Sequence, residues 1–92
     1  MSDNVYYVTH ELKILPKYFE DVLSGRKTFE IRIEDKAKFN VNDKLLLREF
    51  DGKKLTGRKL RAKVTYVLRD EQYCKPGYCI MAIEVISAGH KP

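Results

Sequence analysis

The segment that decides the fold covers residues 25–33 and reads GRKTFEIRI. Gly25 follows a stretch of helical spacing that opens at Pro16; proline suits the first turn of a helix, and glycine readily takes the left-handed conformation that ends one. From Thr28 onward polar and apolar residues alternate, which predicts a strand with two unlike faces. One face presents Thr28, Glu30 and Arg32, and the other presents Phe29, Ile31 and Ile33. The segment therefore predicts a helix end, a turn with two cations and a strand carrying a charged ledge.

The other strands are predicted from alternation and from turn signals. Alternating patterns mark Tyr6–Ile14 and Leu60–Arg69. Lys44–Phe50 is expected to form a strand after a mostly polar loop, and Asp51-Gly52 is a strong turn signal after it. The stretch Tyr78–Ile86 is almost continuously apolar, as expected of a strand buried on both faces. Within Leu60–Arg69, the side chains expected to face inward are Leu60, Ala62, Val64, Tyr66 and Leu68. Five strands and one short helix predict a mainly β fold of the α+β type, arranged as a small closed or nearly closed barrel.

Length and composition indicate one domain. The 92 residues, 43% of them hydrophobic, suit a single domain over residues 1–92, whose ends at 1–4 and 87–92 we expect to be mobile. The longest charge-free apolar run, Tyr78–Ile83, is far shorter than the roughly 20 residues of a membrane-spanning helix, and the N-terminus does not resemble a secretory signal. We therefore expect a cytoplasmic protein that does not enter a membrane and whose two cysteines stay reduced.

The net charge of +5 is concentrated in one short segment. Residues 53–63 hold six cations and no acid. The six are Lys53, Lys54, Arg58, Lys59, Arg61 and Lys63. Such a stripe attracts phosphate groups by counterion release, so we expect these side chains to contact a nucleic-acid backbone. A solvated hairpin kept soluble by edge lysines explains the pattern equally well.

The cysteines and His10 have ordinary structural interpretations. Cys74 and Cys79 flank a Pro-Gly turn, but a structural zinc site needs four ligands, so we expect no metal and no cofactor. Cys79 is predicted to be a small core residue and Cys74 a loop thiol. His10 lies on the apolar row of the first strand, where a buried histidine is usually satisfied by backbone groups. At the end of a barrel it would instead contact a bound base or sugar.

Several segments together resemble a known family. Residues 10–14 read HELKI, an aromatic helix ends in Ser24-Gly25, residues 26–32 read RKTFEIR, and Val41-Asn42-Asp43 leads into LLLRE at residues 45–49. In this order they resemble a small ASCH-type (activating signal cointegrator homology) family of bacterial and phage proteins, similar in fold to the RNA-binding PUA domain. Further matching segments are Thr56-Gly57-Arg58, Val64–Leu68 and Gly77–Ile83. The chain departs from the family pattern at Asn42, where a glycine is usual.

The resemblance implies a five- or six-stranded barrel with a cleft beside its first helix that takes RNA or a modified nucleoside. On this mapping Lys27, Glu30 and Arg32 lie at the cleft. Further candidate ligand-binding residues near it are Lys13, Arg26 and Lys36. The leading hypothesis is an RNA-binding module in which Lys27 and Arg32 hold a phosphate or a base edge while Glu30 orients Arg32. The aromatic side chains considered for base stacking are Tyr7, Phe50 and Tyr73.

Two other functions fit the sequence. One branch of ASCH proteins hydrolyses an acetyl amide on cytidine with a Lys, a Thr and a Glu. Lys27 and Arg32 match that branch, but Glu30 stands where it has the Thr. A small amidohydrolase acting on a modified nucleoside would use Lys27, Glu30 and His10. In the third hypothesis the barrel is a scaffold and the basic stripe binds an acidic protein partner. We expect binding rather than catalysis because the hydrolytic triad is incomplete.

Overall fold

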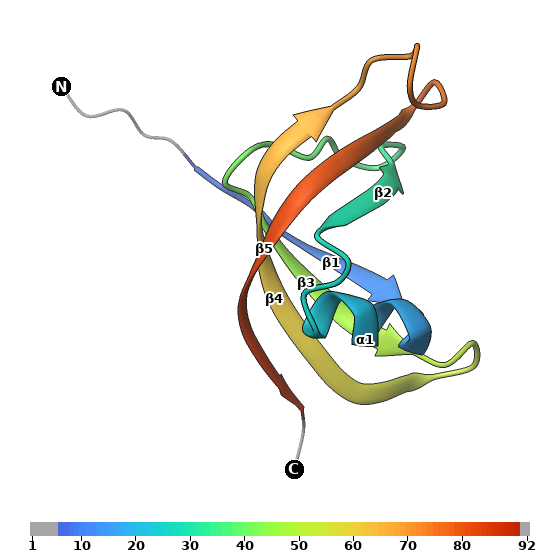
Figure 1. The fold of residues 1–92 in the computed structure, drawn as a ribbon, viewed down its shortest axis with the longest axis vertical. Coiled ribbons are helices and arrows are strands. Elements are labelled where there is room, and N and C mark those ends of the chain that lie inside the picture. The colour runs from blue at the N-terminus through green and yellow to red at the C-terminus, as the bar shows by residue number, and fades with distance from the viewer. Residues whose placement is uncertain (1–5, 91–92) are drawn as a thin grey trace, which may run out of the picture.

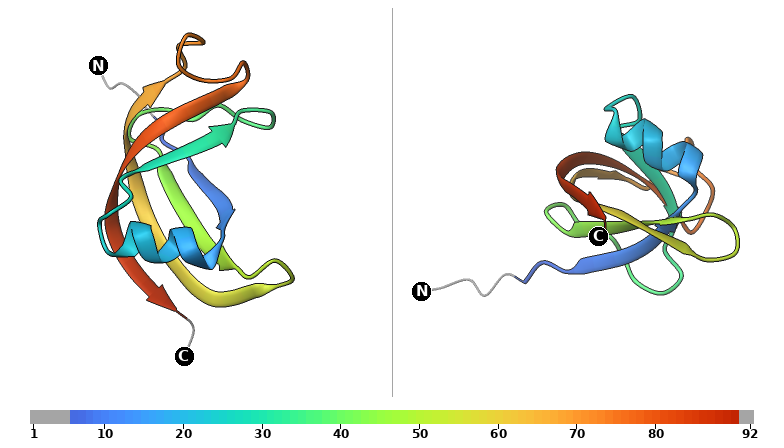
Figure 2. Two further views of the ribbon diagram at one scale, coloured as in Figure 1. Left: turned by 45° about the vertical axis from the view of Figure 1, so that its right-hand side comes forward. Right: turned by 90° about the horizontal axis from the view of Figure 1, so that it is seen from below.

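Five strands form one strongly curled sheet, with a helix packed inside the curl. The computed structural model describes residues 6–90. Its elements are β1 (Thr9–Ile14), α1 (Pro16–Leu23), β2 (Phe29–Ile33), β3 (Lys44–Phe50), β4 (Leu55–Leu68) and β5 (Tyr78–His90). The strand order is β1-β3-β4-β5-β2, in which β1 and β3 are parallel and all other neighbours are antiparallel (Figure 1). The mainly β fold with one short helix is confirmed, and the sheet curls into a half-barrel (Figure 2).

The helix is determined by the residues at its two ends and on one side. Pro16 occupies its first turn, and Gly25, with φ of +83°, follows its last turn in the left-handed conformation that glycine tolerates. Phe19 and Val22 are buried between α1 and the sheet. Tyr18 is 42% exposed, so the helical spacing did not place every aromatic side chain in the core.

The core fills the concave side of the sheet. Alternate residues of β3 and β4 point into it, because successive side chains of a strand face opposite sides. Leu45, Leu47 and Leu60 are at most 1% exposed, and each contributes about 1.5–3 kcal/mol through burial. The complete set of buried apolar side chains is Ile14, Phe19, Val22, Phe39, Leu45, Leu47, Leu60, Ala62, Val64, Cys79, Met81 and Ile83.

On β2 the charged row points inward and the apolar row points outward. The register with β5 places Glu30 beside Met81 and Arg32 beside Cys79, and both of these β5 residues belong to the core. Glu30 is therefore 3% exposed, whereas Ile31 is 54% exposed. The predicted alternation is confirmed, and the register with β5 makes the charged ledge an interior feature.

Several predicted details are wrong. A register shift between Val64 and Tyr66 turns β4, so Val67 packs against the core while Tyr66 is exposed. Leu68 pairs with Ile80 on the outer side, as Tyr66 does with Ala82. In β5 the burial alternates instead of covering both faces, and Ile86 is 52% exposed.

The chain ends also differ from the expectation. The segment 87–90 is not a mobile tail but part of β5, where it pairs with residues 58–61 of β4. Long-range pairing of this kind leaves no local signal. The other ends expected to be mobile, residues 1–4 and 91–92, lie outside the described residues. β1 begins at Thr9, and Tyr6 and Val8 are exposed rather than part of the inward row.

Asp43 anchors the start of β3 to β1. Its carboxylate accepts hydrogen bonds from the Val8 amide (3.1 Å), the Asn40 amide (3.0 Å) and His10 Nε2 (2.8 Å). His10 is thus a largely buried structural side chain, in line with the first interpretation, but its partner is a carboxylate rather than a backbone group. Asn42 has φ of +79°, which asparagine tolerates, so the turn forms without a glycine at this position.

Ionisation of Asp43 stabilises the fold. Burial acts to raise the pKa of Asp43, but the hydrogen bonds from His10, Val8 and Asn40 outweigh burial and hold the pKa below its ordinary value of 3.8. A carboxyl group whose pKa is lowered by folding stabilises the protein above its unfolded pKa, and the contribution is lost as the pH falls through the folded value.

We predict that Asp43→Asn lowers the free energy of unfolding by about 1–3 kcal/mol at pH 7, because it removes the charged acceptor. The difference from the natural protein should shrink as the pH falls below 3.8. Urea unfolding at a series of pH values measures both. Asp35→Asn is the matched control, since Asp35 is exposed in the loop after β2. A difference for Asp43→Asn that does not shrink in acid would contradict this role for Asp43.

Candidate functional site

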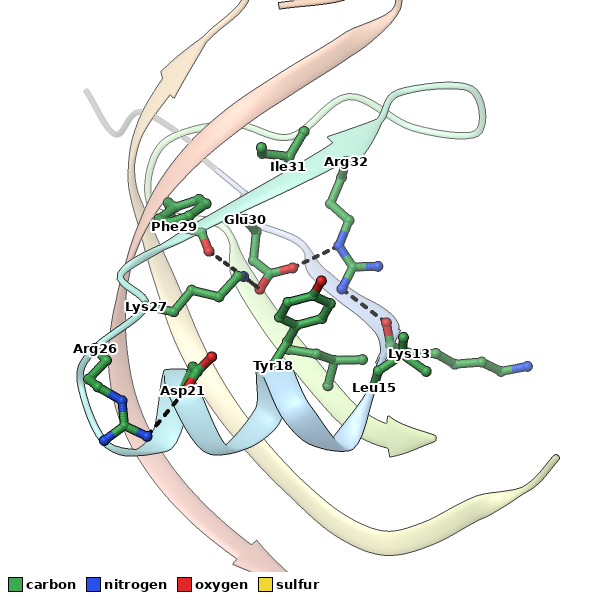
Figure 3. Close-up of a pocket in the computed structure, with 11 residues that line it drawn as sticks. Lys13, Leu15, Tyr18, Asp21, Arg26, Lys27, Phe29, Glu30, Ile31 and Arg32 are labelled. Carbon is green, nitrogen blue, oxygen red and sulfur yellow. Dashed lines mark hydrogen bonds and ion pairs between the residues drawn. The ribbon is translucent and has the colours of Figure 1, made fainter. Parts of the chain in front are cut away.

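A hollow of about 680 Å³ lies between α1 and the two edge strands of the sheet (Figure 3). In residues 6–90, β1 and β2 are not paired with each other, so they face each other across a gap in the sheet, which we call the seam. The hollow opens at this seam, and we call it the seam hollow. Its lining consists of Lys13, Ile14, Leu15, Tyr18, Asp21, Arg26, Lys27, Phe29, Glu30, Ile31 and Arg32.

The floor of the seam hollow contains a buried carboxylate between two cations. Glu30 Oε1 accepts a hydrogen bond from Arg32 Nε at 2.9 Å, and Glu30 Oε2 accepts one from Lys27 Nζ. Lys27 Nζ also donates to the Phe29 carbonyl oxygen at 2.7 Å. The side chain of Glu30 is 4% exposed, compared with 16% for Lys27 and 23% for Arg32. Two cations share one anion, so the cluster retains one positive charge.

Arg32 also joins the two edge strands. Its Nη2 donates to the Lys13 carbonyl oxygen at 2.9 Å, which spans the seam from β2 to β1. Odd-numbered residues of β2 direct their backbone groups toward the seam, because Thr28 and Glu34 direct theirs toward β5. The backbone of Ile31 therefore borders the hollow with one donor and one acceptor. In the described part of the chain, Arg32 Nη1 makes no hydrogen bond, as Figure 3 shows for the site residues.

Exposed aromatic side chains form the rim. Tyr18 on α1 is 42% exposed and Phe29 on β2 is 43% exposed. Lys27 Nζ lies 5.0 Å from the centre of the Phe29 ring and 5.8 Å from that of Tyr18. At such distances a cation is attracted to the ring face, which helps to hold Lys27 between the two rings.

The turn between α1 and β2 positions Lys27. The Lys27 amide donates to the Asp21 carbonyl oxygen at 2.9 Å, so the turn folds back on the helix. Arg26 Nη2 donates to the Asp21 carboxylate at 3.2 Å and is 72% exposed, an ion pair worth little in water. Arg26 therefore marks the outer border of the seam hollow.

β2 is held at its other end by an Arg–carboxylate pair. Arg69 donates from Nε and Nη2 to the two oxygens of Glu34, at 2.7 and 2.9 Å. These hydrogen bonds lower the pKa of Glu34, burial acts against them, and the hydrogen bond from the Phe39 amide adds to the lowering. The bidentate geometry fixes the direction of β2 as it leaves the seam.

The structure brings most of the predicted ligand-binding residues together. Lys27, Glu30, Arg32 and Arg26 line the seam hollow, and Lys13 borders it through its carbonyl group, whereas its side chain points away (Figure 3). Two other candidates lie elsewhere: Lys36 is exposed in the loop after β2, and His10 is held at Asp43. Neither lines the hollow.

Sequence reasoning missed the aromatic part of the lining. Tyr18 and Phe29 border the hollow, whereas the stacking candidates Tyr7, Phe50 and Tyr73 do not. The helical spacing groups Tyr18 with the core residues Phe19 and Val22, which hides its exposure. The exposure of Tyr18 could have been predicted from its position next to Phe19. Two adjacent residues of a helix point in different directions, so both cannot point into the core.

The predicted basic stripe separates into three groups. Lys53 and Lys54 lie in the exposed β3–β4 turn, where their amides bond to Asp51. Arg58 points inward, bonds to Glu20 at 2.5 Å and stacks 4.5 Å from the centre of the Phe19 ring. Only Lys59, Arg61 and Lys63 remain together on the outside of the sheet among the six predicted residues.

The cysteines do not form a site in the described residues. Cys79 is fully buried, and burial raises the pKa of its thiol to about 11. The Cys74 thiol donates to the Asp70 carbonyl oxygen at 3.3 Å. Both thiols are free, and residues 6–90 contain no group of His, Cys, Asp and Glu arranged to hold a metal ion. Likewise, none of the described residues forms a helix long and apolar enough to cross a membrane.

Comparison with known sequences identifies the family. Residues 9–83 match the model of a domain of unknown function, DUF3850. The chain belongs to this family. The DUF3850 match runs from the start of β1 into β5 and contains every residue of the seam hollow.

A phage protein is similar in sequence to part of this DUF3850 chain. The "Uncharacterized 12.9 kDa protein in GpA 3'region" of Escherichia phage P2 is 41% identical over 58 residues, which cover 63% of this chain and 52% of the phage protein. The matched part therefore spans about half the length of that relative.

We predict that Glu30→Ala lowers the free energy of unfolding of this DUF3850 domain by about 2–3 kcal/mol, because two partly buried cations lose their shared partner. Their residual exposure keeps the loss below that of a fully buried ion pair. Glu84→Ala is the matched control, since Glu84 is exposed and makes no ion pair with the described residues; its effect should stay within about 0.5 kcal/mol. Equal losses in urea unfolding would show that the buried carboxylate does not hold the seam.

Proposed function

We propose that this chain is an RNA-binding module of the PUA-like kind and that the seam hollow takes one nucleotide. The observation that carries the proposal is the pairing of two features in one hollow. Its cations are fixed by a buried carboxylate, and its rim is formed by exposed aromatic rings. A nucleotide offers a counterpart for each feature, because it combines a phosphate and polar base edges with a flat π face.

The size of the hollow supports a ligand of this class. Small-molecule sites usually enclose roughly 300–1,000 Å³, and about 680 Å³ leaves room for a base with its sugar. The hollow also lies beside α1 and next to Lys27, Glu30 and Arg32, where the resemblance to ASCH proteins places the cleft.

Arg32 and Tyr18 each have a use in binding a nucleotide. Glu30 and the Lys13 carbonyl occupy Nε and Nη2 of Arg32, which leaves Nη1 to donate to a phosphate or to a carbonyl oxygen of a base. A guanidinium held in one orientation loses little freedom on binding, so its contacts favour affinity. The ring of Tyr18 supplies a face on which a base stacks.

The lining favours binding over hydrolysis. It contains no Ser, Thr or Cys, and Thr28 lies in a separate hollow with Ser24, Gly25 and residues of β5. Lys27 donates to a carboxylate and to a carbonyl, so its nitrogen is not directed at the hollow as a base or nucleophile. The amidohydrolase hypothesis therefore has less support than the binding hypothesis.

We predict that Tyr18→Ala weakens binding of single-stranded RNA about 5- to 150-fold, which corresponds to the loss of one stacked base. Tyr73→Ala is the control, since Tyr73 is 70% exposed in the β4–β5 loop and lies outside the hollow. Fluorescence anisotropy with labelled RNA at low salt measures both dissociation constants. Binding by the two variants with the same affinity would exclude the seam hollow as the nucleotide site, and no binding by the natural protein at low salt would refute the function.

A further inference from the structure

The outer face of β1, β3 and β4 gathers six of the 18 Lys and Arg residues of the chain. Directly paired residues of a sheet point to the same side, and the register places Lys44 opposite Lys63 and Arg48 opposite Lys59. In the same way, Lys13 of β1 lies beside Arg48 of β3. The six cations of this surface, which we call the outer basic face, are Lys13, Lys44, Arg48, Lys59, Arg61 and Lys63.

These cations are only partly neutralised on the sheet. Like charges directly opposite each other on neighbouring strands lower stability, and the face contains three such pairs. Among the described residues, two carboxylates share the face: Glu11, which bonds to Arg48 at 2.6 Å, and Glu84, which is paired with Lys63 in the register. Arg61 lies between Leu46 and Ser87 without an acid beside it. A surplus of this kind attracts polyanions.

The composition of the face fits phosphates better than an acidic protein. Four of the six cations are lysines, a residue type depleted in protein–protein interfaces and common at phosphate contacts. The face is also the convex side of a curled sheet (Figure 2). Lys13 borders the seam hollow and Lys59 borders a smaller hollow beside α1, but the other four cations of the face line none of the three hollows. An interface with a protein usually needs a pocket for an anchoring side chain, whereas phosphate groups need only accessible charges.

Lys13 connects this face with the seam hollow. Its carbonyl oxygen accepts the hydrogen bond from Arg32 at the edge of the hollow, while its side chain extends away from the hollow (Figure 3). Lys13 Nζ lies 4.6 Å from the centre of the Phe50 ring, and Phe50 lies on the same side of β3 as Arg48. A chain that leaves the hollow over β1 therefore meets Lys13 first and Arg48 and Lys59 next.

We propose that a single-stranded nucleic acid held at the seam hollow continues across β1 at Lys13 and places its phosphates along the outer basic face. This inference rests on the proposed function for the nature of the partner, but it depends on different residues. The path uses Lys44 and Arg48 of β3, which the basic stripe in the sequence did not include. It leaves out Arg58, which is held on the inner side by Glu20 and Phe19.

The test compares two double variants that remove the same charge from one hairpin. Lys59→Gln with Lys63→Gln alters the outer basic face, and Lys53→Gln with Lys54→Gln alters the exposed turn. The probes are a single-stranded RNA of roughly 20 nucleotides and a dinucleotide that fills only the hollow, each titrated between about 50 and 200 mM salt.

We expect the face variant to lower the salt dependence of binding of the long RNA, log Kobs against log salt, by a slope of about 1.4, because each lost phosphate contact on a single strand removes about 0.7. The turn variant should keep the slope of the natural protein. Both variants should bind the dinucleotide as the natural protein does. The thermal midpoint of the face variant should equal or exceed that of the natural protein, because Lys59 no longer opposes Arg48.

Equal salt-dependence slopes for the two variants would overturn the proposed path across the outer basic face, but not the proposal that the seam hollow binds a nucleotide. Loss of dinucleotide binding by Tyr18→Ala, with an unchanged slope for the face variant, would lead to the same conclusion. The opposite pattern, a lower slope for the face variant with dinucleotide binding that does not depend on Tyr18, would overturn the hollow and with it the continuous path. Competition by polyglutamate as effective as that by RNA of equal charge would assign the face to an acidic protein instead.

Discussion

The half-barrel depends on one buried carboxylate. Glu30 lies on the inner side of β2, where the register with β5 places it next to core residues. Burying an unpaired carboxylate there would lower the stability of the fold. Hydrogen bonds from Lys27 and Arg32 to the two oxygens of Glu30 offset this cost. Through Lys27 it fixes the turn after α1, and through Arg32 it reaches the backbone of β1. The two edges of the sheet are thus connected by one carboxylate and its partners.

This arrangement also explains why the site lies inside the curl. A strand with three apolar residues in alternation would ordinarily turn them toward the core, but β2 turns Phe29, Ile31 and Ile33 outward. The exchange puts charged groups at the seam, where they are shielded from bulk water and fixed by each other. Electrostatic contacts with a ligand are stronger in such a setting than on an open surface. The outer basic face shows the contrast, since Lys13, Lys59 and Arg61 are exposed to solvent.

Local signals predicted the parts of the fold that depend on neighbouring residues. Pro16 and Gly25 bracket α1, the end of the polar loop predicted the observed bounds of β3 from Lys44 to Phe50, and Asp51-Gly52 lies at the predicted turn. What the sequence did not reveal depends on contacts between distant segments. The pairing of 87–90 with β4, the bulge that turns Tyr66 outward and the bond between His10 and Asp43 are of this kind.

In the candidate site too, local groupings could be predicted from the sequence, whereas contacts between distant segments could not. Lys27, Glu30 and Arg32 are two or three residues apart on one strand and its turn, so their grouping follows from strand geometry alone. The part played by the Lys13 carbonyl could not be predicted, because it requires β1 and β2 to face each other although they are not paired. The prediction of Arg58 as a surface cation is wrong for a similar reason, because contacts with Glu20 and Phe19 of α1 hold Arg58 on the inner side.

The bond from Arg32 to the Lys13 carbonyl gives the seam a property that a backbone ladder lacks. A ladder separates only when several hydrogen bonds break together, but here a rotation of one guanidinium releases one strand edge from the other. Arg32 Nη1 is separate from that bond, so it can take a further acceptor while Nη2 keeps the Lys13 oxygen. A molecule bound at Nη1 would therefore leave the hydrogen bond across the seam in place.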